Sequence, residues 1–378
     1  MHSDSEHWLE RWSTAGLLDE AAVTRIRTFE QQHAGSSRLR WPILAAWMFG
    51  AAMIGGGVLL FVAAHWDTLS PGQRFSLVAL LVGSFHVAGA LVSGRSGGLS
   101  QALHAVGTVA LGAGIALAGQ IFHLEEHWPG GIMLWAIGAA VGWALLRHTP
   151  QMVLLALLGP AWLAGEWIVA LDDRTDAAGM RVLTGGAFLL ALTYFTAPGP
   201  GRVTVSRRAL LWIGGLALPV ASIFLAVFDS AGLLNRDGDG ETLSLWLRIV
   251  GATAALGLPL GLAFALHRAA AWPCAIAALW VLALFGLHSL PGGVAPYVWW
   301  AIGAVGLGAW GLRDARSERI NMGAAVLAAT ILTFYFSQVM DKLGRSASLV
   351  GFGILFLAGG WALDRVRRRL VLQAKGVA

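Results

Sequence analysis

The sequence has little charge and almost no cysteine. Charged residues make up 12% of its 378 residues, whereas about a quarter of an average soluble domain is charged. An ordinary soluble globular domain is therefore excluded. The single cysteine, Cys274, rules out an intramolecular disulfide and leaves histidine and carboxylate groups as the ligands of any metal site. Because Cys274 lies inside an apolar run, we expect it to pack in the core.

Motifs of the common enzyme classes are also missing. No nucleophile elbow, phosphate-binding loop or dinucleotide fingerprint occurs in an appropriate context. The glycine-rich segment at 112–119, GAGIALAG, lies inside a long apolar run, where small residues let helices approach closely. The sequence therefore predicts no cofactor, identifies no substrate and favours a role other than catalysis.

Long apolar runs fill most of the chain. Hydrophobic residues make up 57% of it, and its mean hydropathy is +0.67. A helix needs about 20 apolar residues to cross the hydrocarbon core of a bilayer. Twelve runs meet this need, at residues 42–64, 75–93, 101–122, 131–147, 151–171, 181–197, 208–229, 245–266, 271–289, 295–312, 320–338 and 347–364. The predicted fold class is all-α, a polytopic membrane bundle of about twelve transmembrane helices.

The basic residues lie at the ends of these runs. The net charge is +5 and the pI is about 10.1, but no basic patch is interleaved with stacking aromatics, so we expect no nucleic-acid partner. With twelve spans, 19 of the 26 Lys and Arg residues fall on the side that holds both termini. Because cations favour the cytoplasmic side, both termini are predicted to be cytoplasmic.

Three regions are predicted along the chain. Residues 1–40 form a cytoplasmic amphipathic arm, 41–364 the transmembrane bundle and 365–378 a basic cytoplasmic tail. The arm is polar and the first apolar run is long enough to span, so no cleavable signal peptide is expected. In the arm, Gly16 ends a first helix and Asp19 stands where it would cap a second. Such a small unit is expected to pack on the membrane or the bundle, or to bind a protein partner.

A short segment recurs in the two halves of the chain. WAIGAAVG occupies 135–142 and WAIGAVG occupies 300–306, each after an outer turn that contains Pro-Gly-Gly. The offset carries the fourth predicted helix onto the tenth. Six helices separate the copies, so this is the pattern of a parallel six-plus-six duplication.

Polar residues gather in two segments, 63–74 (AAHWDTLSPGQR) and 119–131 (GQIFHLEEHWPGG). Under the predicted topology both lie at the outer ends of neighbouring helices. The candidate site residues are His65, Asp67, Arg74, Gln120, His123, Glu125, Glu126 and His127. We expect four of them to lie near one another, namely His65, Asp67, His123 and Glu126.

Three interpretations of this outer cluster remain open. Imidazole and carboxylate groups suit zinc or manganese, and His123, Glu126 and His127 would converge if the helix continued one turn. Histidines that titrate near physiological pH, beside carboxylates, would also suit a mouth for protons or solutes. In the third interpretation, the acidic groups pair with Arg74 and with exposed helix ends as a structural cap.

Ionisable residues inside the predicted spans are few: His86, His104 and Glu166. A carboxylate at the centre of a membrane helix costs a few kcal/mol, so one that persists faces the bundle or a wet cavity. Glu166 lies two-thirds along its run and therefore nearer the outer leaflet. For His86 we expect a hydrogen-bonded packing role.

The order of several segments resembles a known family. AGLLDEAAVTRI at 15–26, GGGVLLFVAAHWDTLSPGQR at 55–74 and GQIFHLEEHWPGGIMLWAIGA at 119–139 are similar to the domain of unknown function 2157 family of predicted bacterial membrane proteins. Residues 318–336 and 343–369 resemble closing helices seen in the same proteins. The resemblance implies a multi-spanning inner-membrane protein and supplies no activity or catalytic residues.

Two classes of function follow from these features. A transporter or channel for a small solute or ion should have paired polar residues along a path at the bilayer midplane, with helices broken there. A scaffold, sensor or assembly factor should instead have a dry core and bind a protein through its arm or outer turns. The twelve spans and the duplication favour the first, and the scarcity of charge in the later helices favours the second. An enzyme acting on lipid is a third class.

Overall fold

The structure of the chain is a computed structural model. It describes residues 11–34, 69–122, 127–171, 177–199, 203–230, 244–287 and 294–336, together with Leu9 and isolated positions between 351 and 365. All regular elements in these ranges are helices, and no strand occurs there. The all-helical fold class is therefore confirmed for the described part of the chain. Two compact units divide the chain, Met1–Arg74 and Phe75–Ala378.

The first unit contains the predicted arm. A short helix through residue 14 ends at Gly16, whose φ of +70° lies in the left-handed region that suits glycine at a helix end. Helix α2 (Glu20–Ala34) then begins, and Asp19 Oδ1 accepts a hydrogen bond of 2.7 Å from the backbone N–H of Ala22. The predicted helix end and cap are both confirmed.

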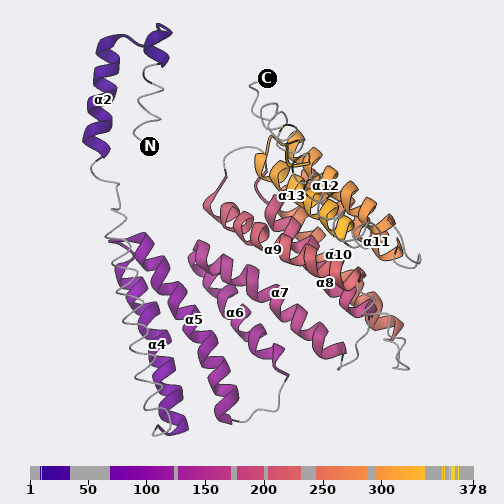
Figure 1. The fold of residues 1–378 in the computed structure, drawn as a ribbon. Coiled ribbons are helices and arrows are strands. Elements are labelled where there is room, and N and C mark those ends of the chain that lie inside the picture. The colour runs from indigo at the N-terminus through magenta and orange to yellow at the C-terminus, as the bar shows by residue number, and fades with distance from the viewer. Residues whose placement is uncertain are drawn as a thin grey trace. The chain divides into compact units, whose positions relative to one another are not determined.

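A series of long helices makes up the rest of the described chain (Figure 1). Helix α4 begins within the first unit and continues into the second. In order, these helices are α4 (Pro71–Val92), α5 (Gly97–Phe122), α6 (Pro129–Leu146), α7 (Thr149–Leu171), α8 (Ala177–Thr196), α9 (Val205–Ser230), α10 (Leu245–His267), the 3-10 turn η2 (Arg268–Ala271), α11 (Trp272–Leu287), α12 (Ala295–Arg313) and α13 (Ser317–Phe334). Ten of the twelve predicted runs thus fall on described helices. The run at 42–64 and most of the run at 347–364 lie outside the described residues.

Among the described residues, six stretches are long and apolar enough to cross a membrane. They are Pro71–Val92, Gly97–Gly119, Pro129–Leu146, Thr149–Leu171, Val205–Ala226 and Leu245–Gly286. The last stretch is 42 residues long and holds two helices, α10 and α11, that contact each other on either side of η2. The chain is therefore a membrane protein with several spanning helices, and the count of twelve spans stays a prediction.

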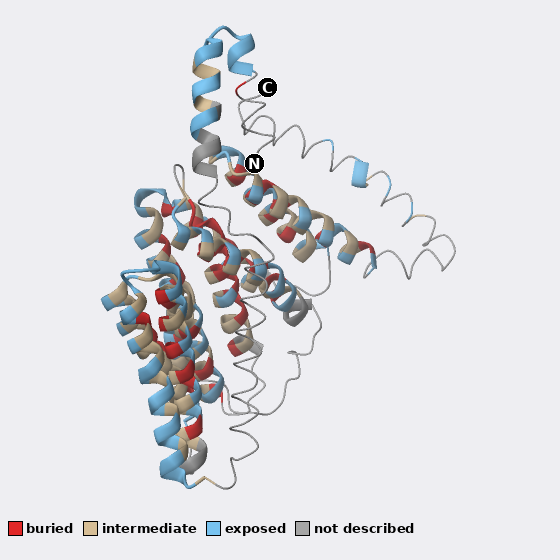
Figure 2. Ribbon diagram, turned by 90° about the vertical axis from the view of Figure 1, so that its left-hand side faces the viewer, coloured by how far each residue is buried: buried red, intermediate tan, exposed pale blue. Residues whose placement is uncertain are grey.

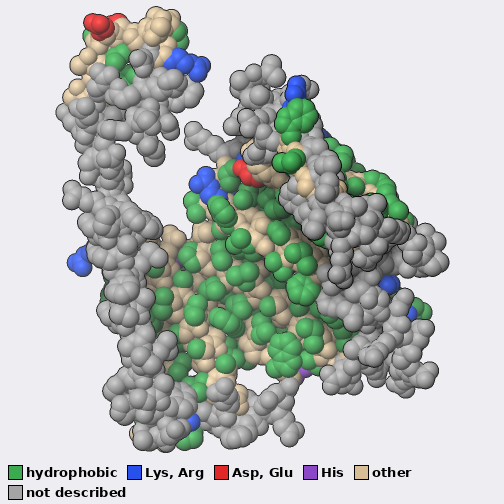
Figure 3. Space-filling model, viewed as in Figure 1, with side chains coloured by type: hydrophobic (Ala, Val, Ile, Leu, Met, Phe, Trp, Pro, Cys, Tyr) green, Lys and Arg blue, Asp and Glu red, His purple; other side chains and the backbone are tan. Residues whose placement is uncertain are grey.

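Hydrophobic side chains cover much of the described surface of the helices, as a bilayer-facing surface requires (Figure 3). Leu145, for example, leaves 78% of its surface exposed. The buried positions lie mainly where helices of the second unit face one another (Figure 2). Burial therefore depends on helix–helix contact, while the outward faces remain apolar.

The largest core cluster centres on α8. Leu192 of α8 packs with Leu218 of α9, Leu284 of α11 and Trp300 of α12, and Cys274 is buried nearby, as expected. Helices α8 and α9 approach so closely that a Cβ on Gly214 would lie 2.2 Å from the backbone nitrogen of Phe195. Small residues that permit such contact are typical of membrane helix pairs.

Proline interrupts the backbone hydrogen bonding of α7 near its middle. Pro160 has no N–H, so the carbonyl of Ala156, four residues earlier, lacks its helical donor. The hydroxyl of Tyr194 in α8 donates to that carbonyl at 2.8 Å. A neighbouring helix therefore satisfies the freed group, as membrane helices require, and α7 remains continuous. Helices α9 and α10 also contain a proline, Pro219 and Pro259.

Candidate functional site

One pair of titratable side chains joins the outer turn to α7. His127, in the turn before α6, lies with Nε2 at 2.6 Å from Oε2 of Glu166. The other carboxylate oxygen accepts a hydrogen bond of 2.7 Å from the indole N–H of Trp162, one turn earlier on α7. Both oxygens of Glu166 are thus engaged. The structure thus brings together a residue of the predicted outer cluster and an ionisable residue of a predicted span.

Packing beside this pair explains its position. A Cβ on Gly165 would lie 2.8 Å from the ring of Trp128, so glycine leaves the space that the indole occupies. Trp128 directly follows His127, and Gly165 directly precedes Glu166. The side chains of His127 and Glu166 are 55% and 34% exposed. The pair is therefore accessible from outside the helical core, unlike an ion pair sealed within it.

The other predicted members of the outer cluster are less informative. Nε of Arg74 donates to the carbonyl of Leu69 at 3.0 Å, close to the start of α4. Gln120 lies in the last turns of α5, but its side chain is outside the described residues. Five members are also outside them: His65, Asp67, His123, Glu125 and Glu126. The predicted proximity of His65, Asp67, His123 and Glu126 therefore stays a prediction.

The two histidines predicted inside the spans meet each other. Nδ1 of His86 in α4 lies 2.9 Å from Nδ1 of His104 in α5. A hydrogen bond between these nitrogens needs one as donor and the other as acceptor, so the pair shares one bridging proton. A Cβ on Gly89 would lie 2.9 Å from the His104 ring, and one on Gly107 would lie 2.9 Å from the His86 ring. Each helix therefore carries a histidine and, three residues later, the glycine that accommodates the partner's ring.

Further polar groups join this histidine pair. Gln151, which is fully buried in α7, donates through Nε2 to the carbonyl of His104 at 3.0 Å and to Oγ1 of Thr108 at 2.9 Å. The indole N–H of Trp135 in α6 donates to the carbonyl of Thr108 at 2.8 Å. The ring of His148 lies 5.7 Å from that of His104, measured between centroids. Four consecutive helices, α4 to α7, are thus linked by one polar cluster, which is buried at His104, Thr108 and Gln151 and partly buried elsewhere.

A metal site is not formed by these groups. Among the described residues, no three His, Cys, Asp or Glu side chains converge closely enough to hold a metal ion. The proposed ligands His123 and Glu126 lie outside that part of the chain, so the metal interpretation of the outer cluster is untested.

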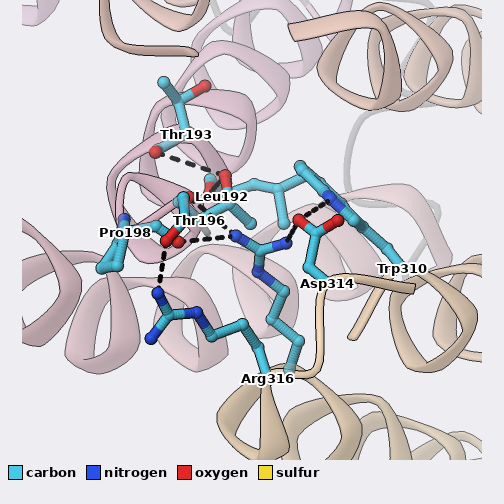
Figure 4. Close-up of polar contacts among 9 residues, drawn as sticks. Leu192, Thr193, Thr196, Pro198, Trp310, Asp314 and Arg316 are labelled. Atoms are coloured by element: carbon cyan, nitrogen blue, oxygen red, sulfur yellow. Dashed lines mark hydrogen bonds and ion pairs between the residues drawn. The ribbon is translucent and has the colours of Figure 1, made fainter. Parts of the chain in front are cut away.

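A further polar cluster, which was not predicted from the sequence, joins the end of α8 to the residues that follow α12 (Figure 4). Arg319, in the first turn of α13, is only 2% exposed and forms an ion pair with Asp314. Its Nη2 donates to the carbonyls of Thr196 at 2.9 Å and Pro198 at 3.1 Å. The guanidinium also lies 4.6 Å from the centroid of Trp310, whose indole N–H donates to Asp314 at 3.0 Å.

This cluster ties the end of α8 to the connection between α12 and α13. The last carbonyls of a helix lack intrahelical donors and carry partial negative charge, which a cation stabilises. Arg316 adds a second contact, to the carbonyl of Gly199. From the sequence alone, both arginines lie near the ends of apolar runs and predict only topology. The feature of the sequence that could have indicated an ion pair is Asp314, which lies in the same short connection.

These features define a class of protein, a membrane protein with several spanning helices. Residues 10–152 match the family described as "Predicted membrane protein (DUF2157)", which confirms the resemblance for that stretch. The stretch contains His127 and the buried cluster around His104, and it ends before Glu166. The resemblances at 318–336 and 343–369 lie beyond it. No curated protein and no solved structure matches the chain significantly.

Proposed function

We propose that this chain is a transporter- or channel-like protein of the bacterial inner membrane, with a proton-handling site at its extracytoplasmic mouth. The observation that carries the proposal is the contact between His127 and Glu166. Histidine titrates near physiological pH, and a carboxylate in a membrane helix favours either protonation or a cationic partner. The pair can therefore hold or release a proton at partly exposed positions.

The distribution of basic residues supports an external position for this pair. With twelve spans, the turn before α6 lies on the side that holds few Lys and Arg residues. Pro160 lies six residues before Glu166, or about 9 Å along the helix axis at 1.5 Å per residue. Because proline removes a backbone hydrogen bond from the middle of α7, it favours bending of this helix near Glu166.

Two parallel halves of six spans remain part of this proposal. The WAIGA segments lie at similar positions in α6 and α12. In each half, the helix that carries the segment packs against the helix that follows, α6 against α7 and α12 against α13. Superposition of the halves in an experimental structure should place α6 on α12. Unrelated positions would mean that the segment recurs through composition alone.

A flux assay tests the proton-handling site. The full chain is reconstituted into liposomes that enclose a pH-sensitive dye, and a potassium diffusion potential drives protons. We expect flux above that of empty liposomes, with Glu166→Gln abolishing most of it and His127→Gln shifting its pH dependence. The matched control is Glu318→Gln, which neutralises an exposed carboxylate in α13. Equal flux in Glu166→Gln and in the control would overturn the proposal.

The second candidate is a scaffold, sensor or assembly factor that works through its arm. Exposed apolar side chains on the described arm favour it, with Leu17 and Phe29 leaving 72% and 58% of their surface exposed. Photocrosslinking residues placed at these two positions in cells would report a partner. A stoichiometric crosslink to one protein, together with flux no greater than that of empty liposomes, would select this candidate over the transporter.

A further inference from the structure

A cavity of about 380 Å³ lies among α8, α9, α11, α12 and α13. Four tryptophans contribute to its wall: Trp272, Trp280, Trp300 and Trp310. Its volume falls within the range of about 300 to 1,000 Å³ that is usual for ligand sites. None of its residues belongs to the pair of His127 and Glu166. An inference from this cavity therefore does not rest on proton handling by that pair, and it shares with the proposed function only the predicted twelve-span topology.

The interior of the cavity offers few polar groups. Ser222 is the one described hydroxyl in its wall, and its Oγ donates to the carbonyl of Leu218 at 2.6 Å. The indole N–H of Trp280 donates to the carbonyl of Trp299, and that of Trp310 donates to Asp314. Three donors of the wall are thus already used, and most of the other lining side chains are apolar, so the cavity favours a hydrocarbon ligand. A polar group placed inside it would lose its hydration without gaining these partners.

The guanidinium of Arg313 places a positive charge at one end of this cavity. Arg313 is the last residue of α12, and its guanidinium lies 4.6 Å from the centroid of Trp272, the first residue of α11. Arg313 is exposed, and no described carboxylate lies within ion-pair distance of it. The neighbouring Asp314 is engaged by Arg319 and Trp310. Among the described residues the Arg313 cation therefore has no carboxylate partner, and it can meet an anion outside the cavity.

We propose that this cavity binds one hydrocarbon chain of an anionic membrane lipid, whose headgroup lies against Arg313. The predicted topology places Arg313 at the cytoplasmic interface, where the headgroups of anionic lipids lie and attract basic residues. An arginine at a helix end extends its charged group toward that interface. An apolar cavity with a cation at one end thus matches an anionic lipid in both parts.

Two substitutions test the charged end and the apolar wall of the proposed site separately. Arg313→Gln removes the charge at its end, and Arg95→Gln is its control, because Arg95 is an exposed cation in the turn between α4 and α5. Ala277→Phe adds bulk to the cavity wall from α11. Leu279→Phe is the matched control on the same helix, because Leu279 is 65% exposed and does not line the cavity.

The full chain is placed in nanodiscs with phosphatidylglycerol or phosphatidylethanolamine that carry the same photoreactive acyl chain. We expect phosphatidylglycerol to label α11 and α12. Arg313→Gln should weaken this labelling about fivefold, because a basic residue near an anionic lipid surface contributes about 1 kcal/mol to binding. Labelling by phosphatidylethanolamine should be weaker and unaffected by Arg313→Gln. Ala277→Phe should reduce labelling by both lipids, and both controls should behave as the unsubstituted protein does.

Three outcomes would overturn the proposal. Equal labelling by the two lipids would mean that the site does not recognise an anion. Equal labelling in Ala277→Phe and Leu279→Phe would mean that the chain does not enter the cavity. Labelling confined to other helices would mean that the lipid chain does not occupy the cavity. If Ala277→Phe fails to fold, Arg313→Gln still distinguishes the first outcome.

Discussion

At the scale of single residues, the contact between His86 and His104 shows how glycine positions polar groups between helices. Each histidine ring occupies the space left by a glycine on the facing helix. The two helices both carry the spacing His-x-x-Gly, at 86–89 and 104–107. Since residues three apart lie on the same face of a helix, each ring faces a glycine when the two helices pack.

Gly107→Ala should therefore destabilise the protein. The new methyl group would lie 2.9 Å from the His86 ring, and overpacking of this kind costs about 1 to 3 kcal/mol. The midpoint of thermal unfolding in detergent should fall. In a His86→Ala background the cost of Gly107→Ala should be smaller, because the clashing ring is absent there.

Gly83→Ala is the control for this experiment. It lies on the same helix as His86, and nothing lies within 4 Å of the added methyl group. Its unfolding midpoint should equal or exceed that of the unsubstituted protein, since alanine favours a helix over glycine. If Gly107→Ala were tolerated equally well, the close contact of α4 and α5 would be wrong.

At the scale of elements, a proline in α7 leaves one backbone carbonyl without its helical donor, and α8 supplies a donor in its place. The carbonyl of Ala156 lacks a donor because residue 160 is proline, and the Tyr194 hydroxyl supplies one. A buried carbonyl left without a donor costs about 1 to 3 kcal/mol. The hydrogen bond between α7 and α8 therefore stabilises the protein because Pro160 leaves the Ala156 carbonyl without a helical donor.

A double-mutant cycle tests this dependence. Tyr194→Phe alone should lower stability by about 1 to 2 kcal/mol, because the Ala156 carbonyl loses its donor. In a Pro160→Ala background the same substitution should cost less, because the new N–H of residue 160 donates to that carbonyl. Unfolding in detergent would measure both costs. Additive effects of the two substitutions would contradict the compensation described here.

The element scale also shows where sequence analysis succeeds and fails. Ten predicted runs coincide with described helices because hydropathy over about 20 residues is a local property. The partner of Glu166 was not predicted, because His127 is 39 residues away and their contact depends on how α6 and α7 pack. Arg319 was missed for the same reason, since the carbonyl of Thr196 is 123 residues away.

At the scale of the whole molecule, the distribution of basic residues predicts the arrangement in the membrane. Basic residues are concentrated on the side that holds both termini if the chain spans twelve times. Eleven or thirteen spans would place the two most basic segments, 1–40 and 365–378, on opposite sides. An even number of spans therefore agrees better with their charge.

Reporter fusions test this topology directly. Alkaline phosphatase is active outside the cytoplasm and a fluorescent protein folds inside it, so each is fused after residues 40, 130 and 378. We expect cytoplasmic signals at the first and last positions and an external signal at 130. An external C-terminus would exclude twelve spans, and a cytoplasmic signal at 130 would place His127 on the wrong side for the proposed mouth.

The sequence by itself determined the class of this protein and the course of its helices. Low charge, long apolar runs and the cap at Asp19 are read from neighbouring residues, so no tertiary information was needed for them. Tertiary structure alone decided which polar groups meet. His86 with His104, and Glu166 with His127, become pairs only when the rotation and packing of separate helices are fixed. Those quantities depend on side-chain fit between helices, which the hydropathy of a single run does not contain.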